Sequence, residues 1–231
     1  MADRGALPAR LARAVADGPP GFPRARRICE TLRELLGADG ASVTLNNLTV
    51  NRVTWCAEDQ RAAELENLQD VLGEGPCRDA FGSRLPVSTG MGRWAASRWP
   101  LFIPAAERVI GPHGVLWSLP MRTAGEVIGT ISLYRLAGGA LAEPVDAAQV
   151  LADAAAVMLL TDPAAGSEVP DADPWTSRSV VHQAVGILMA QLGTGAGGAL
   201  AVLRSRAFTT GTQLAQVARA VVDGTLDLSD R

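Results

Sequence analysis

The chain has 231 residues, of which 48% are hydrophobic and 19% are charged, and its formal net charge is −3. This length fits one large domain or two small ones with a proper core, and the composition excludes a disordered chain and a uniformly basic nucleic-acid-binding protein. No apolar run has the roughly 18 to 20 residues of a membrane span, and no signal-peptide core is present at the start, so we expect a cytoplasmic protein without a membrane partner.

Cysteine and histidine are scarce. Cys29, Cys56 and Cys77 are an odd number at wide spacing, which argues against a disulfide framework and against a zinc site. His113 and His182 are the two histidines, so a histidine-dependent active site is poorly supplied. No catalytic triad, carboxylate pair or phosphate loop is recognisable. We therefore expect neither an enzyme nor a bound cofactor or metal.

The first part of the chain alternates helices and strands. Residues 1–21 are treated as an N-terminal extension, and helical spacing of apolar residues then predicts a helix over 24–36. A strand pair is predicted over 41–48 and 50–57, with a turn around Asn46-Asn47. A polar helix is predicted over 58–72, with one face made of Leu65, Leu68 and Leu72.

The middle of the chain carries the clearest strand signals. Residues 94–110 are predicted to be partly helical, with interruptions at Pro100 and Pro104. Residues 114–122 and 126–135 alternate apolar and polar side chains around a short glycine-containing turn, which predicts a β-hairpin.

A last helix of this region is predicted from Pro144 to about Leu160. Strands in the middle with helices at both ends predict an α+β domain over 22–160, in which helices cover an antiparallel sheet. Residues 161–174 are rich in proline and acid and form a linker. Residues 175–231 then form a second, all-α domain.

Three short amphipathic helices make up this tail, over 176–192, over 196–208 and from Leu214 onward. Thr194 is placed to cap the second helix. Thr210-Gly211-Thr212-Gln213 fits the capping-box pattern before the third. A three-helix unit of this size is too small for an enzyme and is typical of an effector module.

The larger region resembles the GAF domain, and in particular the actinobacterial GAF domains that precede RNA-binding tails. Four pieces in order carry the resemblance: 72–80, Pro86-Val87, 98–102 and 128–135. The resemblance implies a small-molecule sensor, although GAF domains bind many ligands or none. Some GAF domains are thiol-dependent reductases, so this alternative stays open.

Three residues are candidates for binding a GAF ligand: Cys77, Trp99 and Trp117. Cys77 lies at the start of a short helix, where its thiol could be reactive or contact a ligand, or it could simply pack beneath the sheet as a small apolar residue. The indole rings could stack on a flat ligand, or they could fill the core.

The tail resembles the ANTAR domain, the RNA-binding output of transcription antitermination regulators. The matching pieces are 183–189, 199–204 and 214–218, leading into Val221-Val222. This resemblance implies that two tails of a homodimer bind paired stem-loops in nascent RNA, so that a terminator hairpin does not form. The family usually has a charged residue at the position of Val185.

The candidate RNA-binding residues combine cations with base-reading groups. Arginines can contact phosphates, His182 and Gln183 can meet base edges, and Gly186 permits close approach or serves as a helix–helix contact. The four candidate cations are Arg178, Arg204, Arg206 and Arg219. Each arginine could instead be part of a solvated helix face, and the whole tail could dock on a partner protein rather than on RNA.

Overall fold

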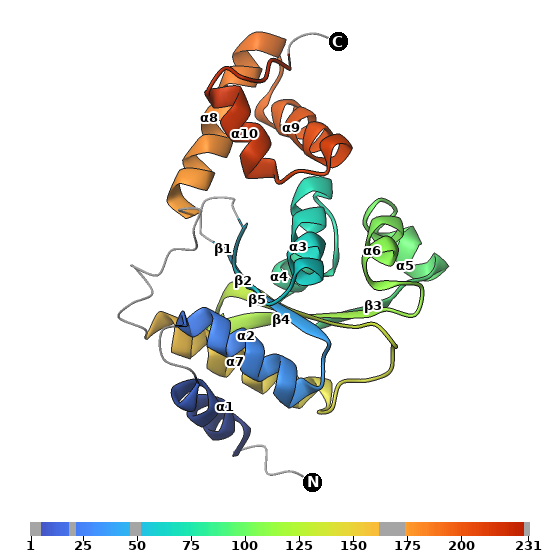
Figure 1. The fold of residues 1–231 in the computed structure, drawn as a ribbon, viewed down its shortest axis with the longest axis vertical. Coiled ribbons are helices and arrows are strands. Elements are labelled where there is room, and N and C mark those ends of the chain that lie inside the picture. The colour runs from blue at the N-terminus through green and yellow to red at the C-terminus, as the bar shows by residue number, and fades with distance from the viewer. Residues whose placement is uncertain (1–5, 19–21, 47–51, 162–173, 229–231) are drawn as a thin grey trace. The chain divides into compact units, whose positions relative to one another are not determined.

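The structure is a computed structural model, and it describes residues 6–18, 22–46, 52–161 and 174–228. The chain divides into two compact units (Figure 1). The first comprises Met1–Glu66 and Glu74–Glu168, and the second comprises Asn67–Gly73 and Val169–Arg231. The expected linker over 161–174 lies almost entirely outside the described residues.

A five-stranded antiparallel sheet forms the centre of the first unit, in the order β2-β1-β5-β4-β3. The predicted antiparallel sheet is therefore confirmed. The strands are β1 (Gly40–Asn46), β2 (Arg52–Ala57), β3 (Val87–Gly90), β4 (Val115–Thr123) and β5 (Glu126–Arg135). The predicted turn between β1 and β2 falls in residues 47–51, outside the described part of the chain.

The β4–β5 hairpin follows its sequence signal closely. Ala124 and Gly125 both have positive φ, 47° and 82°, as a two-residue type I′ turn requires. The register between the two strands shifts at Met121/Arg122, which marks an irregularity just before the turn. Since β5 pairs with both β1 and β4, this hairpin fixes the middle of the sheet.

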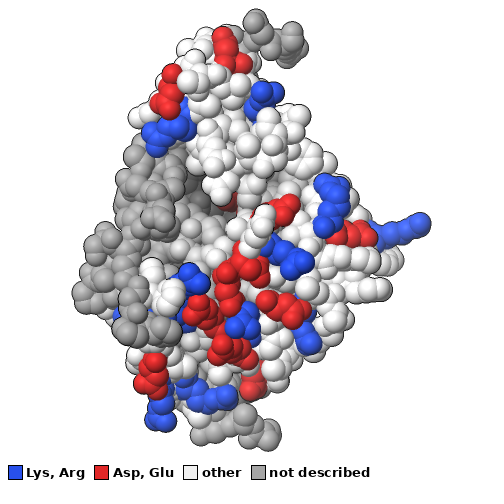
Figure 2. Space-filling view, viewed as in Figure 1, with Lys and Arg blue, Asp and Glu red and all other residues white. Residues whose placement is uncertain are grey.

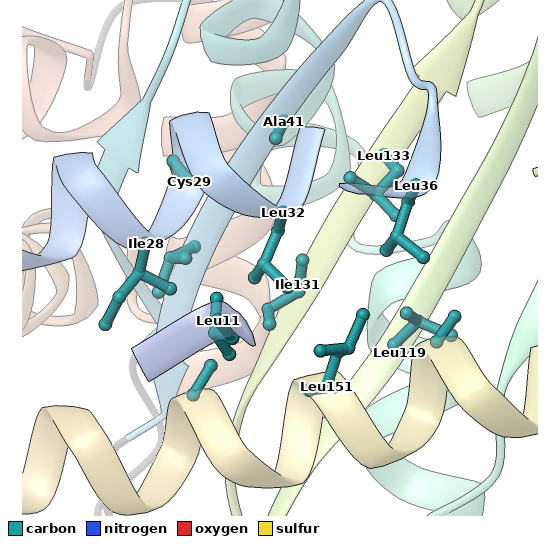
Figure 3. Close-up of a cluster of buried hydrophobic side chains, with 14 of the residues drawn as sticks. Leu11, Ile28, Cys29, Leu32, Leu36, Ala41, Leu119, Ile131, Leu133 and Leu151 are labelled. Carbon is teal, nitrogen blue, oxygen red and sulfur yellow. The ribbon is translucent and has the colours of Figure 1, made fainter. Parts of the chain in front are cut away.

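Two helices cover one face of the sheet and enclose the main core: α2 (Arg24–Leu36) and α7 (Val145–Leu160). Figure 3 shows Leu32 of α2, Leu151 of α7 and Ile131 of β5 in the space between these elements. All three side chains are fully buried. The helix predicted over 24–36 is confirmed with the same bounds, and Gly37 ends it in the left-handed conformation.

The N-terminal extension contains a helix that the sequence analysis does not assign, α1 (Ala6–Asp17). Leu7, Leu11 and Val15 recur at a spacing of four and are all buried in the same core as α2 and α7. Arg27 of α2 donates a hydrogen bond to the Val15 carbonyl at 2.9 Å. This helix is therefore part of the first unit.

The other face of the sheet carries α4 (Pro76–Ser83) and the first turns of α3 (Gln60–Leu72) (Figure 1). The leucine stripe expected on α3 is wrong in part. Leu65 is buried, but the buried positions beside it are Ala62 and Glu66, whereas Leu68 is only half-buried. A buried carboxylate on this helix follows from the polar strand surface that it faces.

Two short helices follow the edge strand β3: α5 (Arg93–Arg98) and α6 (Phe102–Ile110). The predicted interruption at Pro100 is confirmed, because the helices are separate there. The one at Pro104 is wrong, since Pro104 lies in the first turn of α6, where a missing N–H removes no helical hydrogen bond. The Glu74 carboxylate accepts hydrogen bonds from the backbone N–H groups of Leu101 and Phe102 at 2.7 and 2.8 Å.

The second unit has three helices around a small core, as predicted: α8 (Pro174–Leu192), α9 (Ala196–Thr210) and α10 (Leu214–Val222). The fully buried residues of the three helices include Ala184, Leu188, Leu203 and Ala218.

Both predicted helix caps of this unit are displaced. Gly195, not Thr194, is the N-cap of α9, without a side-chain cap. The capping box of α10 pairs Gln213 with Gln216, while Thr210 still belongs to α9. Propensity places a cap only to within a few residues, because neighbouring polar side chains compete for the same N–H groups.

Among the described residues, no single helix has the length and apolarity of a membrane span. One pair, Gln183–Leu192 with Ala196–Thr210, meets that criterion only jointly, across a bend of 106°.

Candidate functional site

The sheet face opposite the main core is lined by hydroxyl side chains. Side chains alternate along a strand, and here serine or threonine occupies the central positions of that face on β1, β4 and β5. The set is Ser42, Thr44, Ser118, Thr130 and Ser132, and each is buried. The register sets Ser42 opposite Ser132 and Thr44 opposite Thr130, so the hydroxyls form one continuous polar surface across three strands.

Glu66 projects from α3 onto this polar surface. Its carboxylate accepts a hydrogen bond from the Ser42 hydroxyl at 2.8 Å and one from the Thr44 hydroxyl at 3.2 Å. Thr44 also lies 3.3 Å from the hydroxyl of Thr54 on β2. Glu66 is 1% exposed, and a carboxylate so deeply buried is rare unless hydrogen bonds or a counter-charge stabilise it. We call Ser42, Thr44, Glu66 and Thr130 the polar sheet site.

Cys77 reaches the same site from α4. Its sulfur lies 2.6 Å from the Thr130 hydroxyl, and both side chains are fully buried. Pro76 begins α4 and Cys77 follows it, which places the thiol in the first turn of the helix. The geometry is that of a small side chain packed beneath the sheet, with a hydrogen bond to β5.

The three ligand-binding candidates do not come together. Trp117 lies in the main core, on the sheet face opposite Cys77. Trp99 ends α5, is 4% exposed, and carries the guanidinium of Arg98 over its ring at 4.7 Å. Cys77 and Trp117 therefore lie on opposite faces of the sheet, and Trp99 lies at the end of α5.

Sequence reasoning misses Glu66, the most informative residue of the polar sheet site. A glutamate in a polar helix is ordinarily exposed, and nothing in its neighbours marks it. The signal that could have found it is the run of hydroxyls on one strand face, at Ser42 and Thr44, and again at Thr130 and Ser132. A buried polar strand face calls for a buried polar partner.

The other two cysteines lie away from Cys77. Cys29 on α2 and Cys56 on β2 are both buried in the main core, and the Cys29 thiol lies 3.8 Å from the Cys56 carbonyl oxygen. Burial, together with the neighbouring Cys56 thiol, raises the pKa of Cys29 well above its ordinary value. A thiol in this state is a poor nucleophile near neutral pH.

In the second unit, α8 presents an open surface around Gly186. Gln183 and Gly186 are exposed, and Met189, one turn further on, is 39% exposed. A Cβ built on Gly186 meets nothing within 4 Å. Nothing in the described part of the chain therefore packs closely on Gly186, so the structure offers no helix–helix contact at this residue. The side chains of Arg178 and His182, both on α8, lie outside the described residues.

Val185 does not share that open surface. It is half-buried and packs against the core of the three-helix unit. An apolar residue at this position therefore contributes to the small core, which explains why it replaces the charged residue that the ANTAR resemblance leads one to expect.

The remaining candidate arginines differ in exposure. Arg206 on α9 and Arg219 on α10 are exposed, as cations for phosphate groups must be. Arg204 is half-buried and its Nε atom is fully buried. Arg206 and Arg219 are thus the two accessible cations among the described candidates.

No group of three or more histidine, cysteine, aspartate or glutamate side chains that could hold a metal occurs in the described part of the chain.

Comparisons with known proteins agree with this division. The sequence model of the GAF domain matches residues 23–159, and that of the ANTAR domain matches residues 175–222. A comparison with curated proteins finds no match.

Three solved structures are similar to the chain at low identity. The chromophore-binding domain of a Stigmatella aurantiaca bacteriophytochrome mutant in the Pr state is 14% identical, with a TM-score of 0.41, over 69% of this chain and 60% of that one. The A. Aeolicus nlh2 GAF domain in an inactive state is 12% identical, with a TM-score of 0.36, over 67% and 90% of the two chains. The wild-type photosensory core module of Stigmatella aurantiaca phytochrome is 11% identical, with a TM-score of 0.41, over 85% and 43%.

The chain spans 60% of the length of the first of these structures. The match over residues 23–159 covers more than half of the 231 residues and coincides with the five-stranded sheet and its covering helices. The chain belongs to the GAF domain family, and its GAF domain is followed by a helical region that matches the ANTAR domain.

Proposed function

We propose that this protein is a cytoplasmic transcription antitermination regulator that binds stem-loops in nascent RNA. The observation that carries the proposal is the ANTAR match over residues 175–222, on a compact three-helix unit with an open α8 surface at Gly186. Exposed Arg206 and Arg219 supply cations for phosphates, and Gln183 supplies donors and acceptors for base edges. Held stem-loops would keep a terminator hairpin from forming.

The regulator acts as a homodimer in this proposal, because paired stem-loops call for two output units. The surface that supports a dimer is the outer face of α7. Val150, Val157 and Leu160 recur there at helical spacing and are 37%, 49% and 60% exposed. Apolar residues aligned along one exposed helix face are typical of an interface with a second copy.

The GAF domain supplies the input in this proposal, and the polar sheet site is where a small polar ligand would act. The Glu66 carboxylate accepts hydrogen bonds there from Ser42 and Thr44, and the Thr130 hydroxyl bonds to the Cys77 thiol. A ligand with donors for Glu66 could replace those bonds and shift α3 and α4 relative to the sheet. The ligand class is thus one with hydrogen-bond donors.

The experiment that tests the proposal is crosslinking of the protein to cellular RNA followed by sequencing of the bound sites. Recurrent twin hairpins upstream of terminators are the expected result. Bound protein partners without enriched RNA would support the alternative, a GAF-based interaction switch, and would contradict antitermination.

The second alternative is a thiol-dependent reductase, and the positions of the thiols argue against it. Cys77 lies on one face of the sheet, and Cys29 and Cys56 lie on the other, all buried. Catalysis by thiols needs an accessible thiolate with a resolving partner nearby. Cys77→Ser should therefore leave RNA regulation intact, and reductase activity that disappears in this variant would contradict the proposal.

A further inference from the structure

The segment from α4 to α6 differs in charge from the rest of the protein. Residues 76–110 contain five arginines and only two acidic residues, in a chain whose net charge is −3. Figure 2 shows arginine side chains that project at the α5–α6 end of the first unit. A cationic segment on an acidic chain marks a surface that attracts an anionic partner.

A hollow of about 470 Å³ lies on this segment, formed by β3, the following turn and α5. Its lining has no acidic residue; it includes Ser88, Thr89, Arg93, Trp94, Arg98 and Trp99. The hollow thus combines aromatic rings, cations and hydroxyls.

Trp94 is 92% exposed, the most exposed of the large apolar side chains described. Such exposure contributes nothing to folding and leaves the whole indole face available. Trp99 behaves differently, since it is buried and Arg98 stacks on its ring at 4.7 Å.

The two arginines of the hollow also have different roles. Arg98 is held by Asp79, with its Nε at 2.8 Å and its Nη2 at 2.7 Å from the same carboxylate oxygen. Among the described residues, Arg93 has no hydrogen bond or ion pair and is exposed beside Trp94. Arg93 and Trp94 therefore form an adjacent free cation and free aromatic ring.

We infer that this hollow is a second RNA-contacting site, which binds a single-stranded segment by stacking an unpaired base on Trp94 and pairing a phosphate with Arg93. Sequence-tolerant stacking on exposed aromatics beside cations is how proteins hold single strands. The inference rests on the proposed function for its choice of RNA as the ligand class.

Two other occupants fit the hollow less well. A small-molecule site buries most of its ligand. Trp94 is 92% exposed and therefore does not enclose a small ligand. A protein partner could also use exposed tryptophan and arginine as anchors, but the surplus of arginine over acidic residues in 76–110 favours a polyanion. A polyanion that lies along the surface and presents flat bases matches both features.

The test measures binding of the full-length protein to an oligouridylate of about ten nucleotides and, separately, to a stem-loop RNA without single-stranded tails. Trp94→Ala should weaken oligouridylate binding by roughly tenfold, and Trp94→Phe should restore most of it. Leu136→Ala, at another exposed apolar residue of the same domain, is the matched control and should change neither affinity.

The slope of log affinity against log salt concentration for oligouridylate binding should fall in Arg93→Ala by the amount of about one phosphate contact. Arg93→Lys should keep the wild-type slope. Photocrosslinking with 5-iodouridine locates the contact, because trypsin cleaves only after arginine in this lysine-free chain. The peptide 94–98 then carries Trp94 alone, separate from Trp99.

Wild-type oligouridylate affinity in Trp94→Ala, or crosslinks confined to residues 174–228, would overturn the inference. Stem-loop binding together with either of these results leaves the proposed function standing and removes only this site. Crosslinks at Trp94 without any stem-loop binding would support this site and count against the proposed function.

Discussion

Tyr134 reports directly on the electrostatics of the GAF domain, because it is the one tyrosine in the chain. Burial raises its pKa above the ordinary value, and its hydrogen bond to Asp59 at 2.6 Å raises it further. The same Asp59 accepts a bond from the Ala62 N–H at 2.7 Å and so caps α3. One carboxylate thus joins β5 to the start of α3.

The phenolate of Tyr134 should therefore appear in absorbance only above the ordinary pKa of about 10. Above that pH the unfolded chain releases the phenolic proton while the folded chain keeps it, so stability falls as pH rises. Asp59→Asn removes the negative charge and should lower the pKa toward, but not to, the ordinary value, because burial remains. A native phenol that titrates at its ordinary pKa would contradict the arrangement.

A substitution at Gly186 is expected to have opposite effects on the stability of α8 and on RNA binding. A Cβ there meets nothing within 4 Å, so Gly186→Ala should stabilise α8 by about 0.5–1 kcal/mol. If RNA approaches the helix backbone at this point, the same change should weaken stem-loop binding.

The matched control is Gly197→Ala, in the first turn of α9, where a Cβ also meets nothing within 4 Å. It should leave stem-loop affinity unchanged. Thermal unfolding and filter binding of both variants measure the two effects. Equal stem-loop affinity in both variants would mean that Gly186 is not at the RNA interface.

At the residue scale, the sequence does not show which individual side chains are exposed and which are buried. Trp94 and Trp99 lie five residues apart in similar surroundings, yet one is 92% exposed and the other 4%. Glu66 lies in a polar helix and is nonetheless buried. Both outcomes depend on which surface the helix meets, and that is decided by chain segments far away in the sequence.

At the scale of elements, α1 makes a prediction about where the GAF domain begins. Leu11 is fully buried against α2 and α7, so Leu11→Ala should destabilise the first unit by about 2–5 kcal/mol, as for other core leucines. Chemical denaturation measures this loss. Arg10→Ala, on the exposed side of the same helix, should have little effect, and an equally small loss in Leu11→Ala would show that α1 does not belong to the core.

Periodicity predicts most of the elements because it reflects local chemistry. The 24–36 helix and the β4–β5 hairpin emerge within a residue or two of their predicted bounds, since an αL glycine and a type I′ turn are encoded by adjacent residues. The leucine stripe of α3 and the caps of α9 and α10 differ from their predictions. Those features depend on tertiary partners or on competition between neighbouring polar groups.

At the scale of the whole molecule, the proposed homodimer can be tested through α7. Val157→Asp adds a charge to the exposed apolar stripe and should produce a monomer without unfolding, because Val157 is 49% exposed. Sedimentation measures the mass. The monomer should bind a twin stem-loop RNA no better than a single one, since avidity requires two linked output units. A variant that remains dimeric would exclude this face as the interface.

The account as a whole rests on RNA binding by the ANTAR-matching unit, and the most direct measurement is the affinity of the full-length protein for a twin stem-loop RNA across a salt series. We predict tight binding that weakens as salt rises, with a slope that falls by about 1 to 2 in Arg206→Ala/Arg219→Ala, because each cation accounts for roughly one phosphate contact. Absence of stem-loop binding at low salt, or a slope identical in wild type and double variant, would contradict the account.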